Sequence, residues 1–442
     1  MVGWRFVPFV AAVFTVAAPA VMSAQGDRVE SAALKRAIDQ TTGLDADALV
    51  RLAFDRAPAI QIGDAQLAAA IGRQQQAALR SNPALFIERR EQVGGDDTAT
   101  TVGASWSAEL GRLAPRRAVA AGQRATAEAT RDESRRQLAA AVREAYGAVL
   151  AAARTISVAE AQMETARLAW RLADERAKTG AGAALDREQA AIEISLLTSR
   201  RARDDQRLET TRLALARVAG LGPTEPLAVR GTLETAAESV ASVAAPYEDA
   251  TPRSDIREAA SEVVTAKART ETARASGRLD FSLSAQYMNM TMAFPLRGFS
   301  AAGDLQPIHG RFHSLSGGLN VVLPVFNRNQ GSVAASQAEE LAATHRLNEV
   351  QLAVAHEQAT ARVRLEQARL SLEAIRDEAL PRSRANLDVV REAYSLGTRP
   401  VADVLGEMRR LQEVEMEYTA ALLELYEAGV AVHVAAGRVD VK

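Results

Sequence analysis

Apolar residues repeat with two different periods along this chain, and each period predicts a different element. Large residues occupy every seventh position of one long stretch: Val142, Val149, Ile156, Met163 and Trp170. Alanine follows three residues after each: Ala145, Ala152, Ala159, Ala166 and Ala173. This alternation of large and small seam residues is typical of a long helix that packs closely against antiparallel neighbours.

A turn follows this stretch, and it predicts a helical hairpin. The long helix begins near Pro115, because proline is tolerated at a helix start. It ends before Gly180, about 95 Å away at ~1.5 Å per residue. A return helix begins at Leu185 and ends at Gly220. The hairpin therefore covers residues 115–220.

In front of this hairpin the period changes to two. Over residues 98–110 the even positions from Val102 onward are apolar, with Trp106 among them, and most odd positions are small and polar. A weaker strand pattern precedes them, and the Gly-Gly-Asp-Asp segment at 94–97 suits a hairpin turn. We expect a strand pair over about 84–110 that is long enough to cross a membrane. Burial in a soluble β-sandwich is the alternative.

The same order of elements returns in the second half of the chain. A helical pattern at 254–276 precedes a strand pair over about 279–325 and a second hairpin at 330–437. A longer loop is expected around 294–312, and the seam of the second long helix continues past Pro381. The seam residues on its two sides include Val354, Ala361, Ala368, Val389 and Leu396.

Landmarks of the two halves coincide numerically. The pairs Gly180 and Gly397, Asp186 and Asp403, and Gly220 and Gly437 are each 217 residues apart. We therefore predict a tandem duplication, because three landmarks share one offset and one order of elements. The predicted divisions are a signal peptide at 1–24, a first repeat at 25–220, a connector at 221–253, a second repeat at 254–437 and a tail at 438–442.

Composition places the chain outside the inner membrane. An apolar run from Val7 to Val16, followed by small residues, has the layout of a secretory signal, with a retained membrane helix as the alternative. Cysteine is absent, so an exported chain must rely on burial or oligomerisation. Both charge signs are interspersed, the net charge is −2, and no nucleic-acid footprint is visible.

Four membrane strands per chain cannot close a barrel, since the smallest membrane barrels have about eight. Lipid does not tolerate open strand edges, so several chains must associate. The small polar strand faces, such as Ser105 and Ser316, would then line a wet lumen. The sequence therefore predicts an oligomeric tube that acts as a conduit.

Two motifs carry a family resemblance. They are Leu323-Pro324-Val325-Phe326 after the fourth strand, and the hairpin tip from Leu396 to Leu405. Together with the order of elements, they resemble the TolC-type outer-membrane factors of tripartite efflux systems, most closely the heavy-metal (CzcC-like) branch. The resemblance covers nearly the whole mature chain.

This resemblance implies a mainly α protein with membrane β: long α-helical hairpins form a periplasmic α-barrel, and four transmembrane strands per chain give a twelve-stranded barrel in a homotrimer. It implies a channel in the Gram-negative outer membrane that extends into the periplasm and docks through a periplasmic adaptor to an inner-membrane pump of RND type. The channel would be a passive exit duct and not an enzyme, with no cofactor. Only the likeness to the heavy-metal branch implies that the cargo is heavy-metal cations.

The resemblance also assigns a gate at the periplasmic tips. Arg399 in one tip would pair with Asp186 in the other and hold the mouth shut. Three copies of Asp403 would form a carboxylate ring. Helix N-capping is the alternative for both aspartates. The position one turn after Asp403 is Gly406, with Glu407 beside it, so a second acidic ring is in question.

The same tips are implied to dock the adaptor. The residues concerned are Gly180, Gly182, Leu396, Gly397 and Thr398. The glycines have a backbone reason as well, because a turn between antiparallel helices commonly needs a positive φ.

Candidate metal ligands are weak, and no metal site is predicted. His309 and His313 are interpreted as residues of a solvated loop. Met288, Met290 and Met292 alternate as thioether ligands of Cu(I) could, but an apolar strand face toward lipid or an interface is the preferred interpretation. The apolar parity switches at Met288, which predicts a bulge or the end of the strand there.

Two other functions compete with the duct. A periplasmic adaptor also carries a long hairpin, although usually one hairpin within a β-domain. A structural periplasmic coiled coil is the third reading. The strand pair before each hairpin favours the duct.

Overall fold

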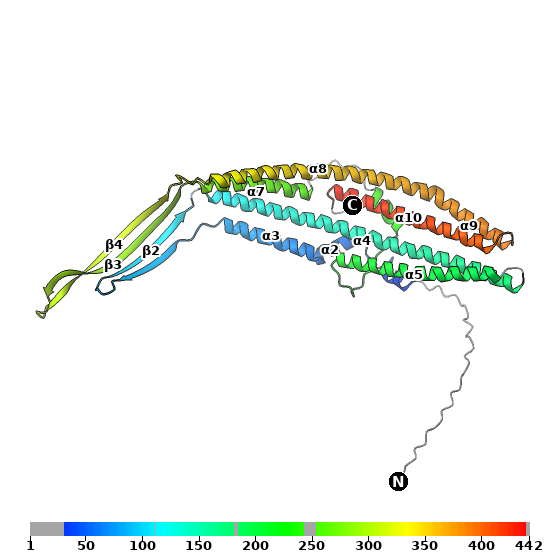
Figure 1. Ribbon diagram of the computed structural model, residues 1–442, viewed down its shortest axis with the longest axis horizontal. Coiled ribbons are helices and arrows are strands. Elements are labelled where there is room, and N and C mark those ends of the chain that lie inside the picture. The colour runs from blue at the N-terminus through cyan, green and yellow to red at the C-terminus, as the bar shows by residue number, and fades with distance from the viewer. Residues whose placement is uncertain (1–30, 110, 181–183, 243–252, 439–442) are drawn as a thin grey trace, which may run out of the picture.

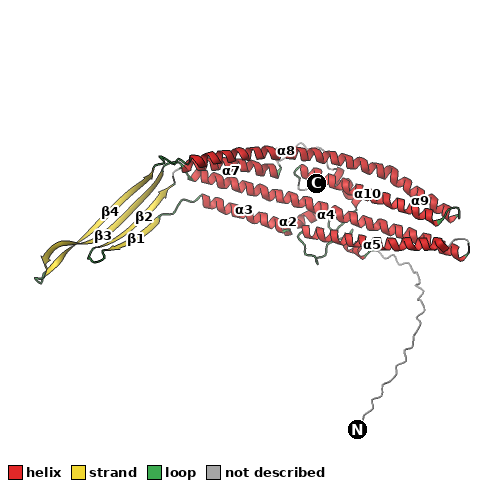
Figure 2. Ribbon diagram, viewed as in Figure 1, coloured by secondary structure: helices red, strands yellow, loops and turns green. Residues whose placement is uncertain are grey.

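The computed structural model describes residues 31–109, 111–180, 184–242 and 253–438. The molecule is an elongated rod, with a sheet at one end and helices along the rest of its length (Figure 1). Colouring by secondary structure shows that strands and helices do not intermix (Figure 2). The fold expected from the two periods, long helices plus four strands, is confirmed.

Helix α4 (Leu113–Lys178) runs the length of the helical part, as the heptad pattern predicts. The seam residues Val142, Val149 and Ile156 are fully buried, and four of the five seam alanines are buried with them. Trp170 is only half-buried. Helix α5 (Ala184–Val218) returns beside α4 and completes the first hairpin.

The second hairpin contains a change of helical geometry. Helix α8 (Gln330–Ala374) continues through a π-turn at Ile375–Ala379 into α9 (Leu380–Ser395), and α10 (Val401–Ala435) returns. Pro381 has no N–H to donate and sits directly after the wide turn, where this loss is accommodated.

The π-turn shifts the buried face of the helix that follows it. The seam predicted past Pro381 is wrong within this chain, because Val389 is 67% and Leu396 is 74% exposed. Leu387 and Tyr394 are buried instead. A π-turn holds more residues than an α-turn, so the seven-residue pattern loses its phase there.

The four strands form one antiparallel sheet in the order β1-β2-β3-β4. Their bounds are β1 Ala84–Glu91, β2 Thr98–Ala108, β3 Asp280–Phe299 and β4 Leu305–Val322. β2 pairs with β3, so the strand pairs of the two halves are joined. Directly paired residues share a face, and Ser105 pairs with Ser284, which pairs with Gly318. The predicted small polar face is therefore continuous across three strands.

Two predictions about the outer part of the sheet are wrong. β3 does not end or bulge at Met288, because its pairing with β4 is unshifted from Asp280 to Phe294 and the irregularity lies between Phe294 and Arg297. The region expected to be a long loop is mostly strand. His309 and His313 consequently lie on β4 and not in a loop.

Five shorter helices of the described chain pack on α4. They are α1 (Ala32–Ala37), α2 (Ala46–Arg56), α3 (Pro58–Ala77), α6 (Leu233–Ser242) and α7 (Ser254–Ser276). Part of the connector is structured, since α6 contributes Leu233 to the main core and Val229 forms parallel bridges with Ile38 and Leu44. No helix in the described ranges has the length and apolarity needed for a membrane span.

Gly147 tests how closely the seam is packed. An added Cβ would lie 2.5 Å from the ring of Tyr426 on α10. We predict that Gly147→Ala destabilises the protein by about 1–3 kcal/mol through overpacking. Thermal unfolding of the detergent-solubilised protein measures this.

Gly72→Ala is the matched control, because Gly72 also lies inside a helix and an added Cβ meets nothing within 4 Å. This variant should be stabilised by about 0.5–1 kcal/mol. Equal effects of the two substitutions would contradict a closely packed seam.

Candidate functional site at the hairpin tips

Both hairpin tips turn through a glycine with a left-handed backbone. Gly180 has φ +73° and Gly397 has φ +80°. After α9, Thr398 N–H donates to the Ala393 carbonyl at 3.0 Å and Gly397 N–H to the Tyr394 carbonyl at 3.0 Å. This pair of bonds is a Schellman motif, which requires the positive φ and satisfies the last carbonyls of the helix. Gly182 lies outside the described residues.

Arg399 lies just before α10, and Asp403 lies in the first turn of that helix. The Arg399 guanidinium is 3.2 Å from the Asp403 carboxylate, and their side chains are 64% and 37% exposed. Within one chain Arg399 thus contacts Asp403 and not Asp186. The N-cap of α10 is Pro400, so the capping alternative is wrong for Asp403. Asp403 instead stands in the first turn, where the positive end of the helix dipole favours a carboxylate.

The contact that joins the two tips is made by Arg176, which the sequence analysis did not single out. Its Nη2 donates to the Ser395 carbonyl at 3.0 Å, and its guanidinium stacks on the Tyr394 ring at 4.7 Å. Burial raises the pKa of Tyr394, and the negative charge of Asp186 raises it further. Asp186 therefore lies close enough to this junction to act on it electrostatically. A basic residue in the last turn before Gly180 was the available signal.

A second polar link lies further along the hairpins. Arg409 on α10 donates from Nε to the Glu193 carboxylate on α5 at 3.1 Å. The Glu193 side chain is only 5% exposed, and its hydrogen bond raises the pKa of Arg409. An apolar cluster from all four tip helices lies beside these links and includes Met163, Leu197 and Met408. The tips of one chain are thus held together as one body.

Gly406 and Glu407 are the two positions considered for a second acidic ring, and their surroundings differ. At Gly406 an added side chain would meet nothing within 4 Å. Glu407 pairs with Arg410 at 3.3 Å, and its other carboxylate oxygen is buried without a hydrogen-bond partner. Its carboxylate is therefore partly engaged within α10.

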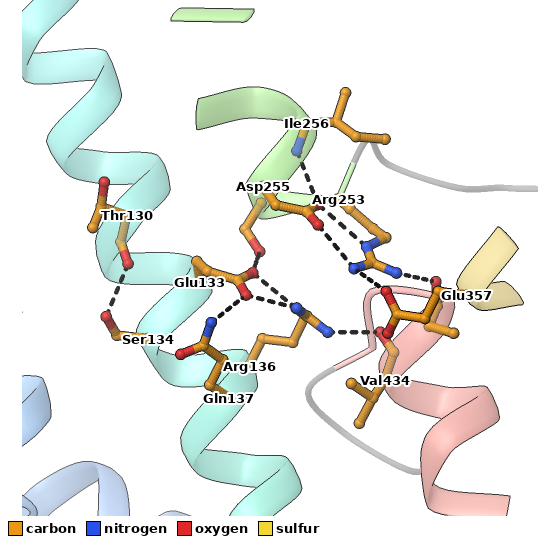
Figure 3. A network of polar contacts seen from close by, with 12 residues as sticks. Thr130, Glu133, Ser134, Arg136, Gln137, Arg253, Asp255, Ile256, Glu357 and Val434 are labelled. Carbon is orange, nitrogen blue, oxygen red and sulfur yellow. Dashed lines mark hydrogen bonds and ion pairs between the residues drawn. The ribbon is translucent and has the colours of Figure 1, made fainter. Parts of the chain in front are cut away.

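A polar network holds the middle of the rod, where α10 ends and α7 begins (Figure 3). Glu133 on α4 accepts from Arg136 Nε at 2.8 Å and from Ser254 Oγ at 2.7 Å. Arg136 also donates to the Val434 carbonyl at 3.1 Å. Burial opposes ionisation of Glu133, but the hydrogen bonds outweigh it and hold its pKa below the usual range.

Arg253 reinforces the same joint from the start of α7. Its guanidinium is 2.8 Å from Asp255 and 2.9 Å from Glu357, and it donates to the Ala435 carbonyl at 2.9 Å. Two buried guanidiniums therefore satisfy the terminal carbonyls of α10, where cations are favoured by the helix dipole. This joint fixes the base from which the hairpins extend to their tips.

The comparisons place this geometry in a family. Residues 246–438 match the family model of the "outer membrane efflux protein". This part of the chain is similar to that family. No curated protein matches the chain.

Solved outer-membrane channels share the fold over most of the chain. A structure of CusC is 16% identical with a TM-score of 0.72, covering 91% of this chain and 96% of its own. The channel OprN is 18% identical with a TM-score of 0.68, covering 92% and 96%. The open-state MtrE channel of Neisseria gonorrhoeae is 18% identical with a TM-score of 0.68, covering 89% of each chain.

The comparisons agree with the predicted family and function, an outer-membrane channel component of a tripartite system, and do not support the adaptor alternative. The same comparisons agree with the predicted location, the Gram-negative outer membrane with an extension into the periplasm. Channels of this family generally form trimers and work passively with adaptor and pump partners.

Arg136 tests the joint at mid-rod. Arg136→Met leaves Glu133 buried without its main partner, and we predict a loss of about 3–5 kcal/mol near neutral pH. In the parent protein the depressed Glu133 pKa contributes stability above the unfolded pKa and loses it as pH falls. In the variant, burial dominates and raises that pKa, so protonation stabilises the variant. The deficit should therefore shrink as pH falls toward 5, as measured by unfolding at several pH values.

Arg124→Met is the control, since Arg124 pairs with Glu128 across a surface where both side chains are 43% exposed. It should cost at most about 1 kcal/mol. An Arg136→Met deficit that does not change with pH would contradict the assignment of Glu133 as the buried charge.

Proposed function

We propose that this channel component is a homotrimeric passive exit duct and carries out no chemical reaction. The observation that carries the proposal is the single sheet whose one face is small and polar and whose strands continue directly into the hairpins. β1 and β4 are the outer strands of that sheet in the described chain. Lipid leaves strand edges without hydrogen-bond partners, so three sheets joined edge to edge would satisfy them. Their polar faces would then line the water-filled path.

Within this duct we assign the chain to two repeats, 25–220 and 254–437, each bearing one strand pair and one hairpin. The shared turn geometry supports the assignment. Gly180 and Gly397 both adopt positive φ, and so do Gly220 (+76°) and Gly437 (+78°). Each of these pairs is separated by the same offset. If one hairpin unit was duplicated, both copies would have the same strained backbone at equivalent positions.

The gate is assigned to the tips, with Asp403, Arg399 and Asp186 as its charged residues. Arg399 is largely exposed, and within the described part of the chain its ion pair is with Asp403, four residues further on. It is therefore free to reach an acidic residue such as Asp186 on a neighbouring chain. Three copies of Asp403 around the mouth would attract cations and repel anions. The contacts of Arg176 and Arg409 keep each chain's two tips together while the mouth opens or closes.

The adaptor is proposed to dock on the same turns. Leu396 is 74% exposed at the end of α9, beside Gly397 and Thr398. An exposed leucine on a rigid turn is an apolar contact that a partner helix can cover. The corresponding turn of the first hairpin contains Gly180 and Gly182.

The cargo is assigned as heavy-metal cations, driven by an RND-type pump. Support comes from the likeness to the heavy-metal branch in sequence and from the shared fold with CusC. The duct needs no cofactor for this role. Deleting the gene and measuring tolerance to metals and drugs tests the cargo, and outer-membrane fractionation tests the duct itself. A freely soluble monomer would overturn the duct.

Arg399→Ser tests the closing link. We predict a more frequently open pore in planar bilayers, because the variant loses the cation that binds the acidic partner. Single-channel conductance measures this. Arg382→Ser is the control, since Arg382 is a 77% exposed arginine of α9 that pairs within its own helix segment with Glu378. An unchanged closed state in Arg399→Ser would remove the link from the proposal.

Asp403→Asn tests the carboxylate ring separately. Neutralising three charges at the mouth should lower the cation-to-anion permeability ratio several-fold, most strongly at low salt where screening is weak. Reversal potentials in asymmetric KCl measure the ratio. Asp388→Asn is the control, because the Asp388 side chain is 76% exposed and lies in the middle of α9, not at the tip. Equal ratios for both variants would contradict the ring.

A further inference from the structure

The outer half of β3 carries three methionines on one face of the sheet. Met288 pairs with Ser314 and Thr101, Met290 pairs with Phe312, and Met292 pairs with Gly310. The register is continuous down to Ser282. Because side chains alternate along a strand, all three methionines share the face of the small polar residues. The sulfurs therefore stand on the proposed lumen side and not toward lipid.

Two aromatic rings and a glycine lie next to the three methionines. The rings of Phe294 and Phe312 meet edge to face, with centroids 6.2 Å apart. They converge over Gly310, where an added Cβ would lie 2.8 Å from the Phe294 ring and 2.9 Å from the Phe312 ring. Glycine opposite Met292 is what allows both rings to lie there. The result is an apolar floor beside flexible thioethers, and sulfur packs favourably against aromatic edges.

The nearby histidines do not belong to this group. His313 pairs with Asn289 and contacts Tyr287, and His309 pairs with Ala293 and lies 3.5 Å from Asp96. These are odd-numbered partners on β3, so both imidazoles lie on the opposite face. Over the described part of the chain, no cluster of three or more His, Asp or Glu is arranged to hold a metal. The donors on the methionine face are thus neutral, the three sulfurs and the hydroxyls of Thr101 and Ser314.

We propose that Met288, Met290 and Met292 form a binding site for a soft monovalent cation, Cu(I) or Ag(I). Thioethers select soft ions, and neutral donors on an apolar floor favour a single positive charge over a double one. Successive methionines on one face are about 6.8 Å apart along the strand. Their side chains are long and unbranched, so neighbouring sulfurs can turn toward one ion.

The position of the site gives it a role in export, and this part rests on the proposed duct. The methionines lie beyond Ser282 and Ser284, farther from the helices. An ion moving outward along the polar face would meet them last. Weak, reversible thioether binding there would hold a soft cation briefly before release. The binding itself depends only on the register of the sheet.

Silver binding to the purified full-length protein in detergent tests the site. Isothermal titration with silver nitrate should show a single ion bound per chain. The triple variant M288L/M290L/M292L should lose at least about tenfold in affinity, because leucine keeps the volume but removes the sulfurs. Met416→Leu, which removes a thioether on α10, is the matched control and should bind silver as the parent does. X-ray absorption of the silver complex should show a sulfur-only shell.

Each outcome decides the proposal. Loss of binding in the triple variant alone, with its thermal unfolding unchanged, supports the site. Equal silver affinity in the parent and the triple variant, or a shell of nitrogen and oxygen ligands, overturns it. Binding that persists in a protein without channel conductance would leave the site standing while the proposed duct fails.

Discussion

Close approach of other helices to α4 is the constraint on which the rest of the structure depends. α4 spans the whole helical part, and α3, α5, α7 and α10 all pack on it. Alanine along its seam, and Gly147 beneath Tyr426, let their backbones come near. Interior packing at this density tolerates little change in volume, so small residues are fixed at many positions of one helix. A continuous central helix then sets the distance between the sheet and the tips.

The rod is held at two levels by different kinds of contact. At its middle, Arg136 and Arg253 satisfy the last carbonyls of α10, and buried carboxylates neutralise them. At the tips, Arg176 and Arg409 link the hairpins across an apolar cluster. The middle joint is the more buried of the two, since Arg136 is 7% exposed whereas Arg409 keeps 57% of its side chain in solvent. Movement is therefore expected at the tips, where polar links can exchange partners with water.

The sheet depends on a simpler rule, the alternation of side chains along a strand. One register, carried without a shift from Asp280 to Phe294, places small polar residues and then three methionines on the same face. The bulge comes only after Phe294. An ion path and a thioether site are thus consecutive parts of one surface. Their order follows from the direction of β3, which leaves the helices at Asp280.

The sequence by itself determined the elements, because periods of seven and two record which faces must be buried. It predicted α4, its turn at Gly180, both strand pairs and the polar sheet face. The sequence did not predict the change of the buried seam at the π-turn. The phase of the helix changes there, beside Pro381, and Leu387 and Tyr394 are buried in place of Val389 and Leu396. Contacts between distant segments were also decided only by the tertiary structure. Arg176 meets Ser395, and Arg399 meets Asp403 and not Asp186, because helix packing fixes which side chains face each other and a one-dimensional pattern carries no such distances.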